Sequence, residues 1–203
     1  MKIKCLPNGP YSLSEPSVRR ENGTPLETGP RASLCRCGGS SRKPFCDGTH
    51  AKIGFSDRNT ADPARNRRVA YTGKAITIFD NRAICAHAGF CTDGLKQVFR
   101  MHAEPWIDPD GAAVAEVIAT IEKCPSGALS YARDGVEAKP PQREPMVTVM
   151  NDGPYAVTGS TELAAVEFGD GASREHYTLC RCGGSKNKPF CDGMHWSIGF
   201  KDP

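Results

Sequence analysis

Apolar and polar residues alternate near both ends of the chain, and this pattern predicts short β-hairpins. The stretches Val147-Thr148-Val149 and Tyr155-Ala156-Val157 are typical of strands, and an Asn-Asp-Gly-Pro turn lies between them. Counterparts lie at 2–6 and 10–13 around a similar turn. We therefore expect both ends of the chain to be mostly β-structure.

The segment between these ends has a different pattern. Residues 69–71 and 75–79 predict a hairpin about Thr72-Gly73-Lys74. Apolar residues at helical spacing predict a helix over 112–122, and a shorter helix is expected over 92–100. This mixture predicts an α+β domain inserted between two β-rich units. The predicted domains are 1–64, 65–140 and 141–203.

The two β-rich units are copies of one another. Asn8-Gly9-Pro10-Tyr11 returns as Asp152-Gly153-Pro154-Tyr155, and Ile53-Gly54-Phe55 returns as Ile198-Gly199-Phe200. A repeated unit that cannot bury its apolar face alone commonly buries it against its copy. We therefore expect the two units to pack together about a pseudo-twofold axis.

Each copy contains the same cysteine-rich block, CRCGGSSRKPFCDGTH at 35–50 and CRCGGSKNKPFCDGMH at 180–195. The cysteines of a C-x-C pair point to one side of an extended strand, whereas a cysteine and a histidine at i and i+4 share one face of a helical turn. Two such pairs can meet at one metal site. The candidate ligands are Cys35, Cys37, Cys46 and His50, and then Cys180, Cys182, Cys191 and His195.

The cysteines of the two blocks could form a zinc site, an iron–sulfur cluster or disulfides. Three cysteines and one histidine form a closed tetrahedral zinc site, although zinc sites usually use C-x₂₋₄-C spacing. The C-x-C pair and the following Gly38-Gly39 favour an iron–sulfur cluster, because backbone N–H groups can then approach the cluster sulfur. Disulfides are the least favoured reading, since adjacent C-x-C cysteines do not bridge comfortably and no secretory signal accompanies them.

Composition limits the partners and the location. The chain has 203 residues, of which 24% are charged, and its net charge is only +3 without any block of Lys and Arg. Nucleic acid is therefore not an expected partner. No apolar run reaches the length of a signal peptide or a membrane span, so we expect a soluble cytoplasmic protein. No Gly-rich phosphate loop, pair of catalytic carboxylates or Ser/His/Asp arrangement is evident, and we expect no enzymatic activity.

Both blocks resemble the CDGSH iron–sulfur family, the mitoNEET-like proteins of microbial type. The family pattern is C-x-C-x₂-[ST]-x₃-P-x-C-D-G-[SAT]-H. The first block matches it throughout, and the second departs only at Met194, where the family has a small residue. The resemblance implies one [2Fe–2S] cluster in each block. It also implies that the chain is a monomer equivalent to two fused subunits, because family members are usually homodimers with one cluster per subunit.

The single histidine in each ligand set suggests the chemistry. Replacing a thiolate by neutral imidazole removes one negative charge and raises the reduction potential of the cluster. The ring nitrogen that is not bound to iron can titrate, so reduction can be coupled to proton uptake. We therefore expect electron transfer with redox partner proteins. The alternative is storage of a cluster and its delivery to an apo iron–sulfur acceptor.

The middle segment has three cysteines of its own. Cys85-Ala-His-Ala-Gly-Phe-Cys91, Pro105-Trp106-Ile107 and a CPSGAL stretch that begins at Cys124 resemble a divergent single-cluster ferredoxin-like family over most of 69–132. Three thiolates suit a third cluster, either [3Fe–4S] or [4Fe–4S], with His87, Asp93 or a water at the fourth iron of the latter. The alternative is a ferredoxin fold without a cluster.

Several other polar residues are predicted to lie on the surface. The basic residues within the ligand blocks are expected to be solvated surface charges, and the alternative is that they favour electron acceptance or the docking of an acidic partner; they are Arg36, Lys43, Arg181 and Lys188. His102 and His176 stand apart from the cysteines and are also expected on the surface.

Overall fold

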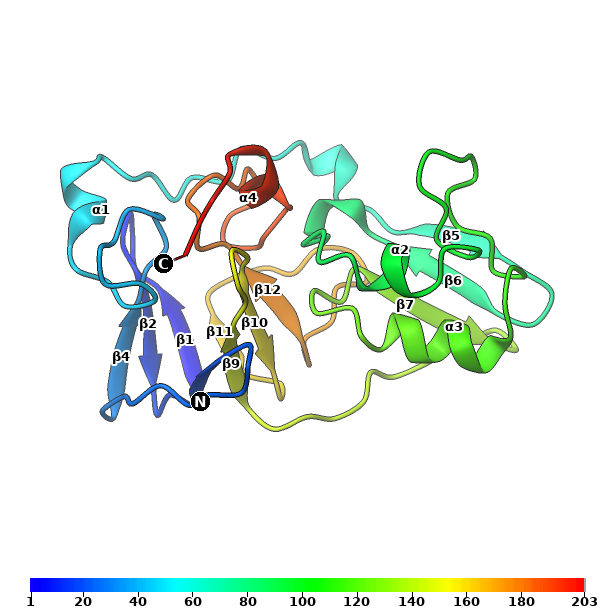
Figure 1. The fold of residues 1–203 in the computed structure, drawn as a ribbon, viewed down its shortest axis with the longest axis horizontal. Coiled ribbons are helices and arrows are strands. Elements are labelled where there is room, and N and C mark those ends of the chain that lie inside the picture. The colour runs from blue at the N-terminus through cyan, green and yellow to red at the C-terminus, as the bar shows by residue number, and fades with distance from the viewer. Residues whose placement is uncertain (203) are drawn as a thin grey trace.

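The computed structural model describes residues 1–202 and shows a mixed α+β fold. Over these residues twelve strands form three four-stranded sheets (Figure 1). The predicted fold class, two β-rich units with an inserted α+β domain, is confirmed. The first sheet has the order β11 (Glu162–Ala164), β1 (Lys2–Cys5), β2 (Tyr11–Ser14), β4 (Arg31–Leu34). The second has the order β12 (Tyr177–Leu179), β10 (Tyr155–Thr158), β9 (Met146–Val149), β3 (Val18–Arg20).

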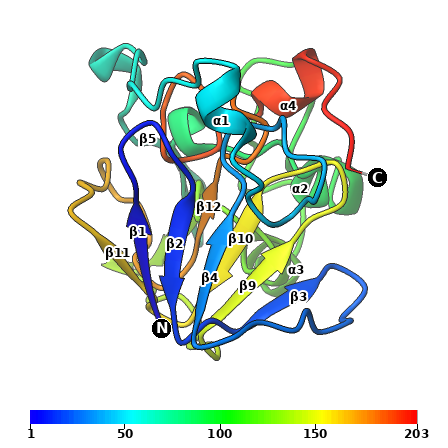
Figure 2. The same ribbon diagram turned by 90° about the vertical axis from the view of Figure 1, so that its left-hand side faces the viewer.

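These two sheets are related by the repeat, and each borrows one strand from the other unit. Strand β11 of the second unit pairs in parallel with β1, and β3 of the first unit pairs in parallel with β9. The other pairings within each sheet are antiparallel, and they match between the units. The exchange is reciprocal, as expected for a pseudo-twofold axis (Figure 2).

The alternation that predicted the strands also explains the core between the two sheets. In β2 the side chains of Tyr11 and Leu13 are buried, and in β10 those of Tyr155 and Val157 are buried, while their neighbours are half-buried or exposed. All four belong to one hydrophobic cluster that contains residues of both units. The burial of this apolar surface stabilises the two units as a single body.

The middle domain carries the third sheet and the longest helix. The sheet has the order β5 (Val69–Thr72), β6 (Thr77–Asp80), β7 (Leu129–Arg133), β8 (Val136–Glu137), all antiparallel. Helix α3 (Val114–Ile121) packs on this sheet through Val117 and Ile121. Its first turn is stabilised because the Glu116 carboxylate accepts a hydrogen bond from the N–H of Ala113.

The predicted helix over 92–100 is shorter than expected and begins earlier. Helix α2 covers Phe90–Gly94, and the chain turns at Leu95, whose φ of −148° is not helical. Leu95, Val98 and Phe99 instead enter the core of the middle domain. Their apolar spacing therefore reflects burial in a turn and not a continued helix. The two remaining α-helices, α1 (Thr49–Lys52) and α4 (Met194–Ser197), are single turns, and 3-10 helices cover Pro63–Arg65 and Arg82–Ile84.

The middle domain is docked firmly on the second β-rich unit. Ile84 and Ala128 of the middle domain belong to the main core. The amide of Asn187 donates to the carbonyl of Ala83 at 3.0 Å. His176, predicted to lie on the surface, is buried in this region with Nδ1 3.0 Å from the Glu175 carboxylate. The prediction was wrong because a polar residue next to the interface cannot be told from a surface residue by sequence alone.

No helix among residues 1–202 has the length and apolar character that crossing a membrane requires.

Candidate metal centres

The four predicted ligands of each block meet as two close pairs. In the first block, Sγ of Cys35 and Sγ of Cys37 are 3.8 Å apart, and Sγ of Cys46 is 3.3 Å from Nδ1 of His50. In the second block the corresponding distances are 3.7 Å and 3.5 Å. No three Cys, His, Asp or Glu side chains of the described chain converge on the position of a single ion.

These distances suit ligands that share one tetrahedral metal. With bonds of about 2.3 Å to sulfur and about 2.0 Å to nitrogen, two such ligands lie about 3.5–3.8 Å apart. Each block therefore offers one pair of sulfurs to one metal and one sulfur–nitrogen pair to another. The donor set fits a two-iron cluster.

Backbone N–H groups complete the surroundings of the sulfurs. Gly39 N–H donates to Cys37 Sγ at 3.4 Å, and Gly48 N–H donates to Cys46 Sγ at 3.5 Å. The second block repeats both bonds at 3.4 Å from Gly184 and Gly193. Such bonds stabilise negative charge on sulfur and raise the reduction potential of a bound cluster.

Local structure explains how the sulfur–nitrogen pair forms. The chain bends at Gly48, whose φ of +88° is in the left-handed region, so Cys46 lies before helix α1 and His50 lies within it. The prediction that both residues share one helical face was wrong in this detail, yet the bend still brings them together. The Asp47 carboxylate accepts hydrogen bonds from the side chains and N–H groups of Thr49 and Ser41, and these bonds hold the pKa of Asp47 well below its usual range.

The substitution of Met for a small residue in the second block leaves this arrangement intact. A Cβ added at Gly184 would lie 3.0 Å from Cγ of Met194, and one added at Gly39 would lie 2.9 Å from Cγ2 of Thr49. Both side chains thus cover the equivalent glycine. The four donors of the second block keep the pairing seen in the first.

Each unit braces the cysteines of the other unit. The hydroxyl of Tyr155 donates to the carbonyls of Cys35 at 2.9 Å and Pro44 at 3.0 Å. The hydroxyl of Tyr11 donates in the same way to Cys180 at 2.8 Å and to Pro189 at 3.0 Å. This brace gives a structural reason for the repeated Gly-Pro-Tyr motif, which sequence reasoning recognised only as part of the repeat.

The two centres are adjacent. Cys37 and Cys182 form an isolated β-bridge between the units. Gly38 and Gly183 permit this approach, because a Cβ on either would lie 2.5 Å from a carbonyl oxygen of the opposing cysteine. Figure 1 shows α1, α4 and α2, which carry or adjoin ligands of the three candidate centres, in a row along the long axis of the molecule.

The arginines of the two blocks are buried, so the prediction of solvated surface charge was wrong for them. Arg36 is 3% exposed and Arg181 is 2% exposed. Arg181 donates to the carbonyls of Gly153 and Met150 and pairs with Asp202 at 2.8 Å. These bonds tie the end of the described chain to the Asp-Gly-Pro turn. The arginines therefore have a structural role that their charge did not reveal.

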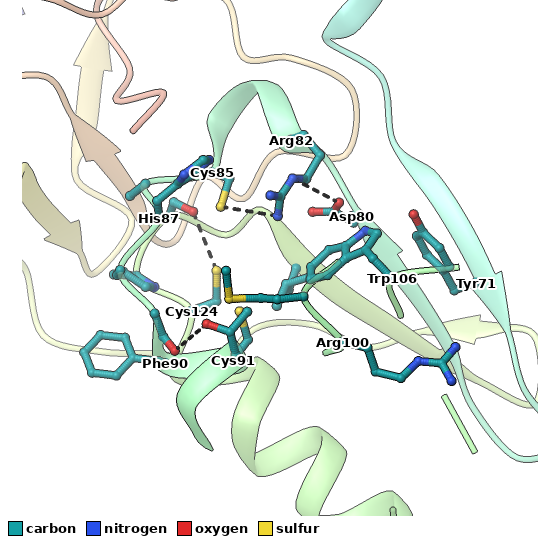
Figure 3. Close-up of a pocket in the computed structure, with 18 of the residues that line it drawn as sticks. Tyr71, Asp80, Arg82, Cys85, His87, Phe90, Cys91, Arg100, Trp106 and Cys124 are labelled. Carbon is teal, nitrogen blue, oxygen red and sulfur yellow. Dashed lines mark hydrogen bonds and ion pairs between the residues drawn. The ribbon is translucent and has the colours of Figure 1, made fainter. Parts of the chain in front are cut away.

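The three cysteines of the middle domain line one cavity of about 730 Å³ (Figure 3). Cys85 follows the 3-10 helix, Cys91 lies in α2 and Cys124 follows α3. Burial raises the pKa of Cys85 to about 12 and also raises that of Cys91. Metals bind cysteine as the thiolate, so a bound cation would have to offset this effect of burial. Three thiols on one cavity can supply a metal cluster with three protein ligands.

The two side chains considered as a fourth ligand have different neighbours. The ring of His87 packs against Gly193 of the second block, where an added Cβ would be 2.8 Å from its Cγ. The carboxylate of Asp93 lies beside Gly89. His87 also lines the cavity of the three cysteines, and ligation by either residue stays a prediction.

Sequence reasoning missed the polar residues of the same cavity. Asp80 ends β6 and is 2% exposed, and burial raises its pKa to about 6. The Arg82 guanidinium lies 3.9 Å from the carboxylate of Asp80 and 3.9 Å from the sulfur of Cys85 (Figure 3). A strand that ends in Asp before a cysteine was the only signal, and it is a weak one.

Two paired-ligand centres and a cavity with three cysteines define an iron–sulfur protein. The family model described as "Iron-binding zinc finger CDGSH type" matches residues 8–51 and 152–196, and the model "Divergent 4Fe-4S mono-cluster" matches residues 71–134. The chain belongs to the CDGSH family and joins two of its domains to a divergent mono-cluster domain.

The chain is also similar to curated proteins of Escherichia coli. The chain is 48% identical over 61 residues to "Uncharacterized protein YjdI" of Escherichia coli strain K12, and the match covers 80% of that protein and 30% of this chain. The protein of the same name from Escherichia coli O157:H7 matches to the same extent.

Proposed function

We propose that the chain is an electron-transfer protein that holds one [2Fe–2S] cluster at each Cys₃His centre. The observation that carries the proposal is the pairing of donors, 3.7–3.8 Å between sulfurs and 3.3–3.5 Å between sulfur and Nδ1, repeated in both blocks. A cluster of this kind stores and releases single electrons when bound. No chemistry on a substrate is part of the proposal.

The residues around each centre support this function. The glycine N–H groups stabilise added negative charge at the sulfurs, and the tyrosine braces fix the backbone of the first cysteine in each block. Rigid ligands lower the cost of rearrangement when the charge of the site changes. The backbone bridge between Cys37 and Cys182 keeps the two centres next to each other.

The middle domain is proposed to hold a third cluster through Cys85, Cys91 and Cys124. The support is the cavity that the three cysteines share. With three thiolates, the alternatives are [3Fe–4S] and a [4Fe–4S] cluster whose fourth iron takes a ligand other than cysteine.

Iron and acid-labile sulfide should be counted on protein purified without oxygen. Two CDGSH clusters give about four irons per chain, and a third cluster raises this to about seven or eight. The protein should be red-brown and should take up electrons reversibly in a redox titration. A colourless protein with bound zinc would overturn the proposal.

Cluster storage and delivery is the second candidate, and the partial exposure of His50 favours it. Incubation with an apo-ferredoxin at pH 6 and pH 8 separates the two functions. Rapid transfer of the cluster to the acceptor supports delivery. Clusters that stay in the protein while they cycle electrons support electron transfer.

A further inference from the structure

The two Cys₃His centres differ in what covers them. At the first centre, Gly48 has no other atom of the described chain within 4 Å of an added Cβ, apart from its immediate neighbours. At the second centre, the equivalent Gly193 is covered by the ring of His87, whose Cγ, Cδ2 and Nδ1 would lie 2.8–3.1 Å from that Cβ. The ligand His195 is accordingly 6% exposed, whereas His50 is only half-buried.

The cover belongs to the middle domain. His87 stands in the segment from Cys85 to Cys91, which begins and ends with two of the three cysteines that line the cavity. The same segment therefore faces two candidate centres. Its ends contribute to the three-cysteine site, and its middle lies on the second Cys₃His centre.

A tryptophan holds this segment in place. The indole Nε1–H of Trp196 donates to the carbonyl oxygen of His87 at 3.0 Å. Trp196 is otherwise 68% exposed, which is unusual for so large an apolar side chain. The first block has Ala51 at the equivalent position, directly after His50. Trp196 and the segment Cys85–Cys91 that it contacts thus both occur at the second centre.

We propose that the segment Cys85–Cys91 is a lid on the second Cys₃His centre, latched shut by Trp196 and held more tightly when the three-cysteine site binds its metal. The first centre has no such lid and is the one that partner proteins reach from solvent. The second centre is enclosed and exchanges electrons with the other two candidate centres of the chain. This inference rests on the proposed function, because it assumes that the centres carry clusters.

The test is the rate at which the loaded protein loses iron to a coloured iron chelator. The wild type should lose its CDGSH clusters in two phases, a fast one from the first centre and a slow one from the second. His50→Cys marks the first centre through its altered absorption and assigns the phases. A single common rate would overturn the proposal.

Three variants test the lid itself. His87→Ala removes the cover, Trp196→Phe removes the latching N–H, and Cys124→Ser weakens the metal site without changing the lid segment. Each should accelerate the slow phase by roughly tenfold and leave the fast phase unchanged. Ala51→Trp is the matched control and should change neither phase, since Ala51 is exposed and no other segment of residues 1–202 covers Gly48. A slow phase that none of the three variants alters would refute the lid.

A second measurement separates failure of the lid from failure of the proposed function. In protein stripped of metal, an alkylating reagent followed by mass spectrometry reports the accessibility of Cys191 and Cys46. Cys191 should react more slowly than Cys46, and His87→Ala should accelerate only Cys191. This result needs no cluster, so it can be positive even if the two-iron assignment is wrong. Equal rates for the two thiols in the wild type would overturn the lid.

Discussion

Tyr11 and Tyr155 cross between the two halves of the molecule, and each supports the metal centre of the other half. Their rings meet edge to face with centroids 6.0 Å apart. Both side chains are fully buried, and burial raises the pKa of each hydroxyl well above its usual value, so both remain protonated donors. The two centres are therefore built jointly by the halves.

This crossing predicts that a tyrosine variant disturbs the distant block. Tyr155→Phe should remove the donors to Cys35 and Pro44 and destabilise the first centre, while the ligands in its own unit keep their bonds. A buried acceptor without its donor costs about 1–3 kcal/mol, which lowers the Tm of a chain of this size by roughly 2–12 °C. Thermal unfolding and the rate of cluster loss measure both effects.

Tyr11→Phe is the matched control for that experiment. It should weaken the second centre and spare the first. If both variants affect the same centre, or each affects the centre of its own unit, the brace does not act as described.

Replacing a histidine ligand should change the redox properties of one centre. His50→Cys or His195→Cys adds a negative charge to the ligand set, and the potential of that cluster should fall by on the order of 100 mV. The dependence of its potential on pH should also flatten, because the titrating ring is gone. Redox titrations at several pH values test both effects. An unchanged potential would remove the histidine from the ligand set.

Loss of a cysteine from the middle domain should remove only the third cluster, although iron should leave the second centre faster. Cys124→Ala removes one of the three thiols in the cavity and leaves both CDGSH blocks unaltered. The iron content should fall by about three or four atoms per chain, while the absorption of the [2Fe–2S] clusters persists. An iron content equal to that of the wild type would show that the cavity holds no cluster.

The buried carboxyl of Asp80 should make stability depend on pH. Burial raises its pKa from 3.8 to about 6, so the folded state is favoured when Asp80 is protonated, and this contribution is lost as pH rises from about 4 to about 6. Asp80→Asn should therefore stabilise the protein above pH 6 by up to about 3 kcal/mol. The effect should be smaller at pH 5.

Urea unfolding of both proteins at pH 5 and pH 7.5 provides the measurement. The difference between variant and wild type is compared at each pH, so that any cluster loss in acid affects both alike. A difference that is equal at the two pH values would show that Asp80 does not titrate in this range. The Oδ1 atom of Asp80 has no hydrogen-bond partner among the described residues, so the amide replaces an unsatisfied group.

Periodicity and repetition were sufficient to predict the fold class and the strand pairs around the two turns. The alternation in 147–149 and 155–157 corresponds to β9 and β10, and the helical spacing from Val114 to Ile121 corresponds to α3. Each of these segments buries one face, and a buried face produces a regular spacing of apolar residues that can be recognised in the local sequence. The division of the chain at residues 64 and 140 stays a prediction.

Contacts between distant segments could not be predicted in this way. The parallel pairs β1–β11 and β3–β9 join strands of only three or four residues that lie far apart in the chain. Arg181 and His176 are buried by partners from other segments, so their sequence neighbours gave no indication of it. The contact between His87 and Gly193 likewise depends on how the middle domain docks.

The exchange of β11 and β3 within one chain allows the two halves to differ in sequence. In an assembly of two identical subunits, every substitution occurs twice, and strand exchange depends on the concentration of the subunits. In one chain, the strands meet at a high effective concentration, and either half can be altered alone. Ala51 and Trp196 are such a divergence. Covalent fusion has therefore permitted a symmetric framework to carry two centres with different surroundings.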